Sequence, residues 1–320
     1  MTACSHSVSG SMRTFVLACL TLGGLLLPTA DRSSAQEVAL DSQDHVTTLT
    51  VNGRLLLEYQ SQSHPTKIYI SRWFTPQGVQ VLRDSPHDHV HHHALMYAIG
   101  IDDIDFWSEV PAEQYGKQVS SGISASSSTT NGKGAATIQQ TIDWVSPKEE
   151  TLGTESRTIT AHLGVLPDAS LLSWKFVLKP GPGKDSMKLW GRHYFGLGIR
   201  FVESMDQGSE FFTAGDAKAE TVRGSEKLTR AAWCACFGNA DGKPLTLAMF
   251  NAPDNPRRPA TWFTMNDPFA YLSATLDLDK EPLTVVAEKP LRACYGIAVW
   301  DGKIDKDVIE QAYQKWLEVR

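Results

Sequence analysis

Hydrophobic and polar residues alternate with a period of two along most of this chain, which is typical of β-strands that bury one face. The segments 46–51 and 54–59 flank Asn52 and Gly53, a pair that favours a tight hairpin turn. Similar alternation between turn residues predicts further strands at residues 67–73, 78–83, 94–101, 136–145, 157–162, 171–178, 188–201, 245–250 and 293–299. Short strands at this spacing favour an antiparallel β-sandwich, so we expect an all-β fold.

One segment, at the C-terminus, has the period of a helix. Asp305 is a suitable N-cap, and apolar residues follow it at intervals of three or four: Val308, Ile309, Ala312, Tyr313, Trp316 and Leu317. A single apolar stripe is typical of a helix that packs on a sheet, so we expect a C-terminal α-helix against the sandwich. Residues 120–134, rich in Ser, Thr and Gly, are expected to form a hairpin tip.

The first 35 residues have the pattern of an export signal. Arg13 precedes an apolar stretch at residues 15–27, and small residues ending at Ala35 supply an A-x-A-like cleavage pattern. We expect cleavage near Ala35, a periplasmic or secreted location, and a single domain over residues 36–320.

Translation from Met12 is an alternative, because Met12 begins a more conventional signal than Met1 does. The apolar stretch is interrupted at Pro28 and is too short for a comfortable membrane span, and no later segment is long and apolar enough. We therefore expect no stable membrane insertion.

Composition narrows the choice of partners. The 320 residues are 42% hydrophobic and carry a net charge of −6. No basic stripe with interleaved aromatic residues is present, so nucleic acid is not an expected partner. The sequence also contains no P-loop and no dinucleotide-binding fingerprint, so no nucleotide cofactor is expected. A small-molecule or glycan ligand is the expected partner.

Three cysteines remain after the expected cleavage: Cys234, Cys236 and Cys294. They allow at most one internal disulfide, so the chain is not a disulfide scaffold. Cys234 and Cys236 would face the same side of a strand. We interpret them as small buried hydrophobic residues.

Histidine is concentrated in one short block. Five of the ten histidines fall within seven residues, namely His87, His89, His91, His92 and His93. Histidine titrates near neutrality and is the commonest metal ligand, so the block indicates proton transfer, a metal site, or both. In an extended block successive side chains would point to opposite faces, whereas a turn would change that partition.

Several motifs around the block resemble a known family. They are Thr75-Pro-Gln-Gly-Val79, Arg83-Asp84, Asp88-His89-x-His91-His92 and Asp105-Phe-Trp-Ser-Glu109, continuing through Trp233 and Asn255-Pro-Arg257. The chain resembles the PmoA-type family of bacterial domains of unknown function, which carries the label methane oxygenase. The resemblance implies a sandwich similar to those of sugar mutarotases and a sugar-directed function.

The label itself is not a guide to function, because particulate methane oxygenase subunits reside in the membrane and this chain has no candidate span. Where the family continues His-His-Arg-Gly, this chain has His92-His93-Ala94. An anion contact by that arginine therefore does not carry over.

Acid and base chemistry on a carbohydrate or an oxidised sugar is the first hypothesis for the block. One histidine would donate a proton to a sugar oxygen while a carboxylate, Glu109 or Asp105, removes another. Such a site performs elimination, epimerisation or hydrolysis. The catalytic candidates are His89, His91, His92 and Glu109.

Two alternatives stay open. A non-catalytic carbohydrate-binding module would need aromatic and polar side chains but no perturbed histidine. A metal-dependent protein, of an oxidase-like kind, would take its ligands from His89, His91 and His92. Two histidines such as His89 and His91 can share a divalent ion, with a third ligand such as Asp88, Glu109 or His193 from elsewhere.

Residues of several types are candidates for substrate binding. Trp107 offers a flat face for a sugar ring, and the loop of residues 255–258 offers amide and guanidinium donors. Each candidate also has a structural interpretation, such as a core position for Trp107 or an ion pair of Arg257 with Asp254 or Asp267. The binding candidates are Arg83, Asp88, Trp107, His193, Asn255 and Arg257.

Overall fold

Antiparallel β-sheets dominate the computed structural model. It describes Met1 and residues 37–130, 133–215 and 217–320. The expected export signal therefore lies outside the described residues, apart from Met1. The described chain is all-β except for two short 3-10 turns, η1 (Ala112–Gln114) and η2 (Glu203–Met205), and one C-terminal helix. The expected fold class, an antiparallel sandwich with a C-terminal helix, is confirmed.

The first sheet has ten strands within the described residues. In spatial order they are β1 (Val38–Gln43), β2 (Val46–Val51), β3 (Arg54–Gln60), β4 (Tyr69–Trp73), β5 (Leu95–Ala98), β13 (Gly196–Arg200), β20 (Tyr271–Thr275), β19 (Ala260–Met265), β16 (Glu226–Ala231) and β15 (Glu220–Arg223).

A second sheet has eight strands and a third has four, counted over the same residues. The second runs in the order β14 (Glu210–Thr213), β17 (Trp233–Ala240), β18 (Lys243–Asn251), β22 (Leu291–Asp301), β11 (Ala169–Pro180), β10 (Thr151–Leu163), β9 (Lys133–Val145) and β8 (Lys117–Thr130). The third runs in the order β21 (Leu283–Val286), β12 (Ser186–Trp190), β6 (Gly100–Ile101) and β7 (Ile104–Asp105).

The two large sheets bury aromatic residues between them. The ring of Tyr97 in β5 lies 4.4 Å from Phe176 in β11 and 5.9 Å from Trp144 in β9. All three side chains are buried. Burying side chains of this size stabilises a fold by roughly 1.5–3 kcal/mol each, so this layer holds the sandwich together.

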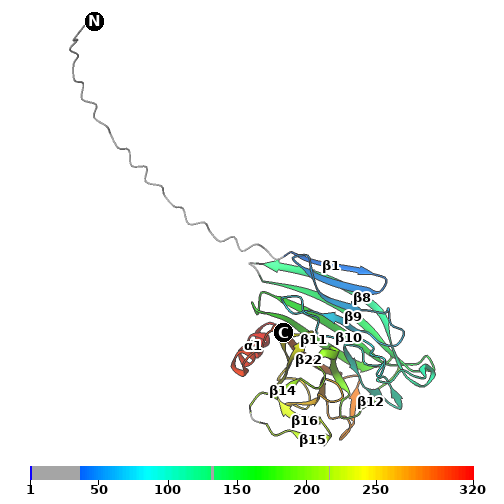
Figure 1. Ribbon diagram of the computed structural model, residues 1–320. Coiled ribbons are helices and arrows are strands. Elements are labelled where there is room, and N and C mark those ends of the chain that lie inside the picture. The colour runs from blue at the N-terminus through cyan, green and yellow to red at the C-terminus, as the bar shows by residue number, and fades with distance from the viewer. Residues whose placement is uncertain (2–36, 131–132, 216) are drawn as a thin grey trace. The chain divides into compact units, whose positions relative to one another are not determined.

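Helix α1 (Lys306–Val319) covers the other face of the eight-stranded sheet and lies beside β11 and β22 in Figure 1. It begins after Asp305, as expected, and Trp316 lies on its buried side. The indole of Trp316 lies over Gly296 of β22, where a Cβ atom would come within 2.5 Å of the ring. Glycine at that position therefore allows the helix to pack closely.

The expected hairpin at residues 52–53 is confirmed. Asn52 and Gly53 have φ angles of 52° and 72°, the left-handed pair that a tight turn between twisted strands needs. The expected hairpin of β8 and β9 is also present, although its tip falls on residues 131–132, outside the described residues.

Two strand predictions were wrong. Residues 78–83 form only isolated bridges, because Val81 N–H donates to Trp73 while Arg83 N–H donates to Arg200, so the segment crosses from one strand to another. Residues 188–201 were expected as one strand, but Phe195 N–H donates to the carbonyl of Arg192 and closes a turn that separates β12 from β13.

The strand register identifies the outer face of the ten-stranded sheet. Tyr97 faces the other sheet, so its neighbour Met96 faces outward. Directly paired residues share a face, and the pairs Tyr69↔Met96, Met96↔Gly198, Gly198↔Ser273 and Ser273↔Phe263 form one row across the sheet. The histidine block lies over this outer face.

Candidate functional site

The histidine block forms a folded loop between β4 and β5. Asp84 and His93 pair across an isolated antiparallel bridge, and Ser85 N–H donates to the carbonyl of His92. Inside the loop, His89 N–H donates to Pro86 and His92 N–H donates to His89. The block is therefore not extended, and these turns decide which histidines meet.

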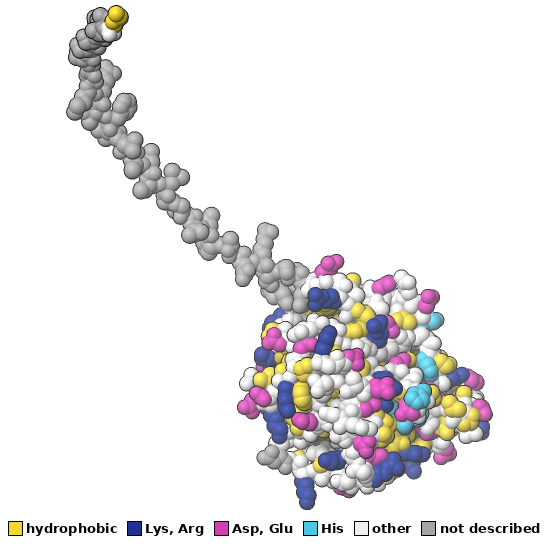
Figure 2. All heavy atoms as spheres, viewed as in Figure 1, with side chains coloured by type: hydrophobic (Ala, Val, Ile, Leu, Met, Phe, Trp, Pro, Cys, Tyr) yellow, Lys and Arg dark blue, Asp and Glu magenta, His cyan; other side chains and the backbone are white. Residues whose placement is uncertain are grey.

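A cavity of about 440 Å³ lies beneath this loop on the outer face of the sheet. We call it the histidine cavity. Figure 2 shows histidine side chains (cyan) near one another at the surface, beside acidic and basic side chains. The lining residues are His89, His91, His92, Trp107, Ser108, Arg192, Tyr194, Arg223, Glu226, Phe263, Met265, Pro268, Phe269 and Tyr271.

The three histidines of the cavity form one cluster. The ring centroid of His92 lies 4.6 Å from that of His91 and 4.7 Å from that of His89. The rings of His89 and His91 are 5.8 Å apart. The structure thus brings together three of the four predicted catalytic residues, although their catalytic role stays a prediction.

Three residues that line the histidine cavity each carry a buried polar group with no hydrogen-bond partner in the described chain. The groups are Nδ1 of His92, Nε1 of Trp107 and the hydroxyl of Tyr271. Each of these residues is more than nine-tenths buried. Leaving a buried donor or acceptor unpaired costs about 1–3 kcal/mol, so three such groups around one cavity point to a ligand that pairs with them.

Glycine at position 198 makes room for one of these groups. The hydroxyl of Tyr271 lies only 1.9 Å from where a Cβ atom on Gly198 would be. Gly198 is paired with Ser273 in the neighbouring strand, two residues from Tyr271. The side chain of Tyr271 therefore lies across the sheet and not away from it.

Burial keeps two of the cavity histidines neutral. It lowers the pKa of His92 to about 2, with His91 and His89 adding to the effect. It also lowers the pKa of His91, with His89 as the next cause. Neutral imidazole both donates and accepts a hydrogen bond, and it can accept a proton from a ligand.

Glu226 supplies the one carboxylate among the described lining residues. Its Oε2 lies 3.0 Å from Nε2 of His193, and its Oε1 accepts a 2.9 Å hydrogen bond from Nε of Arg223. His193, a predicted binding residue, thus lies directly behind the cavity wall. The sequence did not single out Glu226, because nothing in its local pattern distinguishes it from a surface acid.

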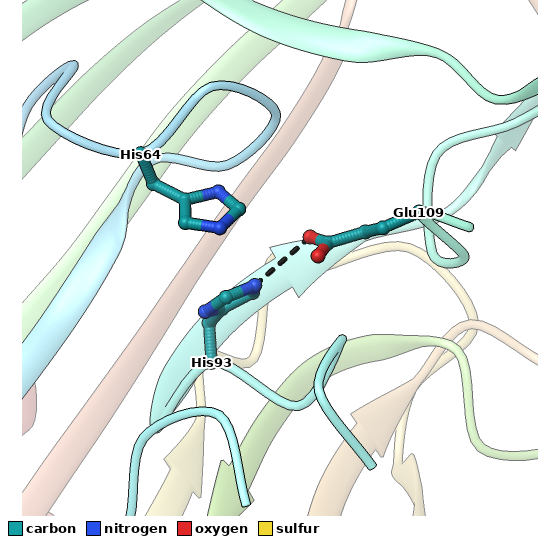
Figure 3. Close-up of side chains that lie close together, drawn as sticks. All are labelled: His64, His93 and Glu109. Carbon is teal, nitrogen blue, oxygen red and sulfur yellow. Dashed lines mark hydrogen bonds and ion pairs between the residues drawn. The ribbon is translucent and has the colours of Figure 1, made fainter. Parts of the chain in front are cut away.

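Glu109 belongs to a different, buried network. Its Oε1 lies 2.9 Å from Nε2 of His93 and 2.9 Å from Nζ of Lys67, and it accepts a 2.8 Å hydrogen bond from Thr66. Figure 3 shows the ring of His64 turned toward His93 and Glu109. Glu109 does not line the histidine cavity. The prediction that it acts there together with the three histidines has no support in this placement.

His93 lies between two carboxylates. Its Nδ1 is 2.9 Å from Asp84, whose other oxygen accepts a 2.9 Å hydrogen bond from Tyr69. Burial opposes the charged form, but the hydrogen bonds to Asp84 and Glu109 outweigh it and raise the pKa of His93. Burial also opposes the charged form of Glu109, which by itself would raise its pKa. His93 and Lys67 outweigh burial and lower the pKa of Glu109 well below its usual range.

This network also contains a possible set of metal ligands. His64, His93 and Glu109 each offer a ligand atom, and these atoms lie within 4.8 Å of one another. A divalent cation there would meet the ammonium group of Lys67 at close range and would compete with hydrogen bonds at both nitrogens of His93. The group therefore fits an ion-pair network better than a metal site.

The metal role suggested for His89 and His91 stays a prediction. Neither residue belongs to the ligand group of His64, His93 and Glu109. Nδ1 of His89 lies 2.9 Å from the carboxylate of Asp88, which is a predicted binding residue.

Besides Asp88 and His193, three predicted binding residues do not line the histidine cavity. Arg83 forms ion pairs with Glu203 at 3.1 Å and Asp206 at 3.7 Å. Asn255 is buried, and its amide bonds both the N–H and the carbonyl of Cys294. Their polar atoms already have protein partners, so this placement gives their predicted binding role no support.

Arg257 is the third of them. Its Nη1 donates to the carbonyls of Leu276 at 2.6 Å and Asp277 at 3.1 Å. The acid that lies near the Arg257 guanidinium is Glu281, 3.8 Å from Nη2, and not the suggested Asp254 or Asp267. Arg257 therefore organises a loop.

Trp107, by contrast, does line the cavity. Phe195 stacks on its ring at a centroid distance of 4.8 Å, so that face of the indole is not free for a sugar.

A larger cavity, of about 690 Å³, lies elsewhere and includes His162. Nε2 of His162 is paired with Ser173 at 2.8 Å, and burial lowers the pKa of His162 to about 4. None of the buried polar atoms without partners in the described residues belongs to the lining of that cavity. Size alone is therefore a weaker indication than the unpaired groups of the histidine cavity.

The cysteines match their structural interpretation. Cys234, Cys236 and Cys294 are free, buried thiols. Burial raises the pKa of Cys236 to about 12 and that of Cys294 to about 11, which keeps both protonated. They act as small hydrophobic residues of the core.

A family model matches residues 46–314, which is most of the chain. The chain belongs to the family of unknown function DUF6807. The assignment to the PmoA-type family was wrong, because the model that matches is that of DUF6807. The sandwich fold that the resemblance implied is present, but the sugar-directed function that it implied loses that basis. No curated protein matches the sequence of this DUF6807 chain.

Solved structures similar to this DUF6807 chain are distant. The α-galactosidase of Lactobacillus brevis is 7% identical with a TM-score of 0.46, covering 84% of this chain and 40% of its own. A putative aldose 1-epimerase of Klebsiella pneumoniae is 9% identical with a TM-score of 0.40, covering 89% of this chain and 84% of its own. This chain thus spans about two fifths of the galactosidase. Likenesses this distant do not decide its activity.

Among the helices of the described residues, none combines the length and the hydropathy that a membrane span requires.

Proposed function

We propose that this DUF6807 chain binds a carbohydrate in the histidine cavity and exchanges protons with it. The observation that carries the proposal is the set of three buried, unpaired polar groups on His92, Trp107 and Tyr271. Sugar hydroxyls both donate and accept hydrogen bonds, so they can pair with an imidazole nitrogen, an indole N–H and a phenol at once. A volume of about 440 Å³ suits a small ligand.

Aromatic side chains support the same ligand class. Tyr194, Phe263 and Phe269 line the cavity beside the unpaired polar groups. Sugar rings present apolar C–H faces that pack on aromatic rings, while their hydroxyls point to the rim. A purely apolar ligand would leave the polar groups unpaired, and an inorganic ion would leave the aromatic surface uncovered.

Neutral histidines support proton exchange. His91 is the proposed proton acceptor, because burial lowers its pKa and leaves a neutral imidazole at the cavity wall. Glu226 is the carboxylate partner in place of Glu109, since it lines the same cavity. Elimination, epimerisation and hydrolysis all need one proton removed and one supplied, and these groups suit that requirement.

Calorimetric titration with a panel of monosaccharides tests the binding proposal, followed by a turnover screen on the sugars that bind. We expect His91→Ala to abolish turnover while affinity stays within about twofold. His87→Ala is the matched control, because His87 is exposed in the same loop and does not line the cavity. Turnover that survives in His91→Ala would contradict the acid and base role, and binding without turnover in the parent protein would make the chain a binding module.

We also propose that the protein is exported. The support is the sequence of the first 35 residues, with Arg13 before an apolar stretch and Ala35 at a cleavage pattern. N-terminal sequencing of the protein from the periplasm or medium tests this. A protein that starts at Gln36 agrees with the proposal, and one retained in the cytoplasm with its first residues intact contradicts it.

A further inference from the structure

The charges around the histidine cavity do not balance. Among the described residues that line it, Arg192 and Arg223 are basic and Glu226 is acidic. Arg223 is already paired with Glu226 at 2.9 Å, and His193 holds the other oxygen of that carboxylate at 3.0 Å. One positive charge therefore remains without a partner.

That charge is on Arg192. Its side chain is exposed at the cavity rim and makes no hydrogen bond or ion pair within the described part of the chain. A guanidinium group presents several donors in a fixed plane, which matches the two oxygens of a carboxylate.

A second cation lies below the cavity. The guanidinium carbon of Arg200 is 3.6 Å from the centroid of Phe269, a lining residue, and Arg200 is buried. Its Nε and Nη1 have no hydrogen-bond partner, and its nearest acid, Asp206, is 3.7 Å away. Asp88, the other acid near this wall, is held by His89. Arg200 is therefore compensated only at a distance by Asp206, and Arg192 is the cation among the described lining residues that has no acidic partner.

We propose that the ligand of the histidine cavity is an acidic sugar whose carboxylate pairs with Arg192. This inference rests on the proposed carbohydrate function and narrows it to uronic acids and related sugar acids. The unpaired groups of His92, Trp107 and Tyr271 take the hydroxyls, and Arg192 takes the carboxylate at the rim. A sugar without a carboxylate leaves the positive rim uncompensated.

Matched pairs of sugars test the inference. D-glucuronate and D-glucose differ at one carbon, which carries a carboxylate in the first and a hydroxymethyl group in the second, and D-galacturonate and D-galactose differ in the same way. By calorimetry at low ionic strength we expect each acid to bind the protein about tenfold more tightly than its neutral counterpart, as a charge-assisted pair provides. Added salt should reduce that preference and leave the neutral sugars unaffected.

Arg192→Gln is the decisive variant. It should remove the preference for the acids and leave the affinity for neutral sugars within about twofold. Arg54→Gln is the matched control, because Arg54 is an exposed arginine that lines the larger cavity and not this one. Its preference for acids should equal that of the parent protein.

The outcomes separate the two proposals. Equal binding of acids and neutral sugars, or an acid preference that persists in Arg192→Gln, overturns the acidic-sugar inference and leaves the carbohydrate function standing. Failure of both classes to bind at millimolar concentration overturns both. Because Arg192 is exposed, the variant is expected to fold, and its unfolding midpoint is measured alongside to confirm this.

Discussion

His92 and His93 are neighbours in the chain, yet their imidazole rings meet opposite environments. The ring of His93 lies 4.6 Å from Tyr69 of β4 and is bonded at both nitrogens to carboxylates. The ring of His92 lies 5.3 Å from Tyr271 of β20, and its Nδ1 has no partner. Two carboxylates favour the charged form of His93, whereas burial favours the neutral form of His92 on the cavity wall.

Tyr271→Phe should separate binding from stability. The hydroxyl of Tyr271 has no partner in the described protein, so its removal should leave the free energy of unfolding unchanged or slightly higher. Affinity for the sugar should fall by about fivefold to tenfold, as expected for the loss of one hydrogen bond of ~1 kcal/mol. Urea unfolding and calorimetric titration measure the two effects.

Tyr97→Phe is the matched control for that experiment. The hydroxyl of Tyr97 is also buried and unpartnered, but its ring lies between the two sheets beside Phe176. The free energy of unfolding of Tyr97→Phe should likewise stay unchanged or rise slightly, while its affinity for the sugar should equal that of the parent protein. Equal loss of affinity in both variants would show that Tyr271 does not contact the ligand.

Glu109→Gln should destabilise the fold strongly. The substitution leaves the charges of Lys67 and His93 buried without their shared carboxylate. Breaking a buried pair on one side costs about 3–5 kcal/mol. Glu149→Gln, which removes the exposed partner of Lys117, should cost less than ~1 kcal/mol. Urea unfolding of the two variants should show this difference, and similar losses in both would contradict the buried network.

The two neighbouring histidines should give stability of opposite pH dependence. The folded pKa of His93 is raised above 6.5, so its contribution is complete below pH 6.5 and is lost as the pH rises through the folded value. The folded pKa of His92 is lowered to about 2, so burial of its neutral ring stabilises the fold above pH 6.5 and this stability falls steadily toward pH 2.

Unfolding free energies of His92→Asn and His93→Asn across pH 4 to 9 check this, each compared with the parent protein. The advantage of the parent over His92→Asn should shrink below pH 6.5, by at most ~1.4 kcal/mol per pH unit. Its advantage over His93→Asn should shrink only above that pH. Parallel pH profiles for the two variants would contradict the assigned protonation states.

Gly198→Ala should displace Tyr271. The added methyl group would lie 1.9 Å from the hydroxyl, so the side chain must move away from the sheet. Overpacking of this kind costs about 1–3 kcal/mol, and sugar affinity should fall with it. Gly122→Ala is the control, because nothing lies within 4 Å of the added atom and φ is not positive there. A Gly198→Ala variant that binds sugar like the parent would show that the position of Tyr271 does not matter for binding.

The sandwich and its helix were predictable because their signals are local. Alternation along residues 46–51, the turn at Asn52 and Gly53, and the stripe that includes Ile309 and Trp316 each depend on a few neighbouring residues. A strand prediction failed where one segment forms backbone hydrogen bonds with two different strands. Residues 78–83 alternate like a strand but bridge from Trp73 to Arg200.

The histidine block led to the candidate site, since His89, His91 and His92 line one cavity. The block did not reveal that His93 belongs to another network, because a turn inside the loop sends adjacent rings to different strands. Asn255 and Arg257 suggested binding by residue type alone, and tertiary contacts with backbone groups occupy both.

The sequence by itself determined the class of fold, the C-terminal helix and the place along the chain where histidines gather. Only the tertiary structure decided which groups share a cavity with them. Tyr271, Glu226 and Arg192 come from positions more than 90 residues beyond the block and reach it through strand pairing and loop packing. Periodicity indicates which face of an element is buried, but the chemistry of a site depends on which distant faces meet. Burial lowers the pKa of His92 there, while two carboxylates raise that of His93.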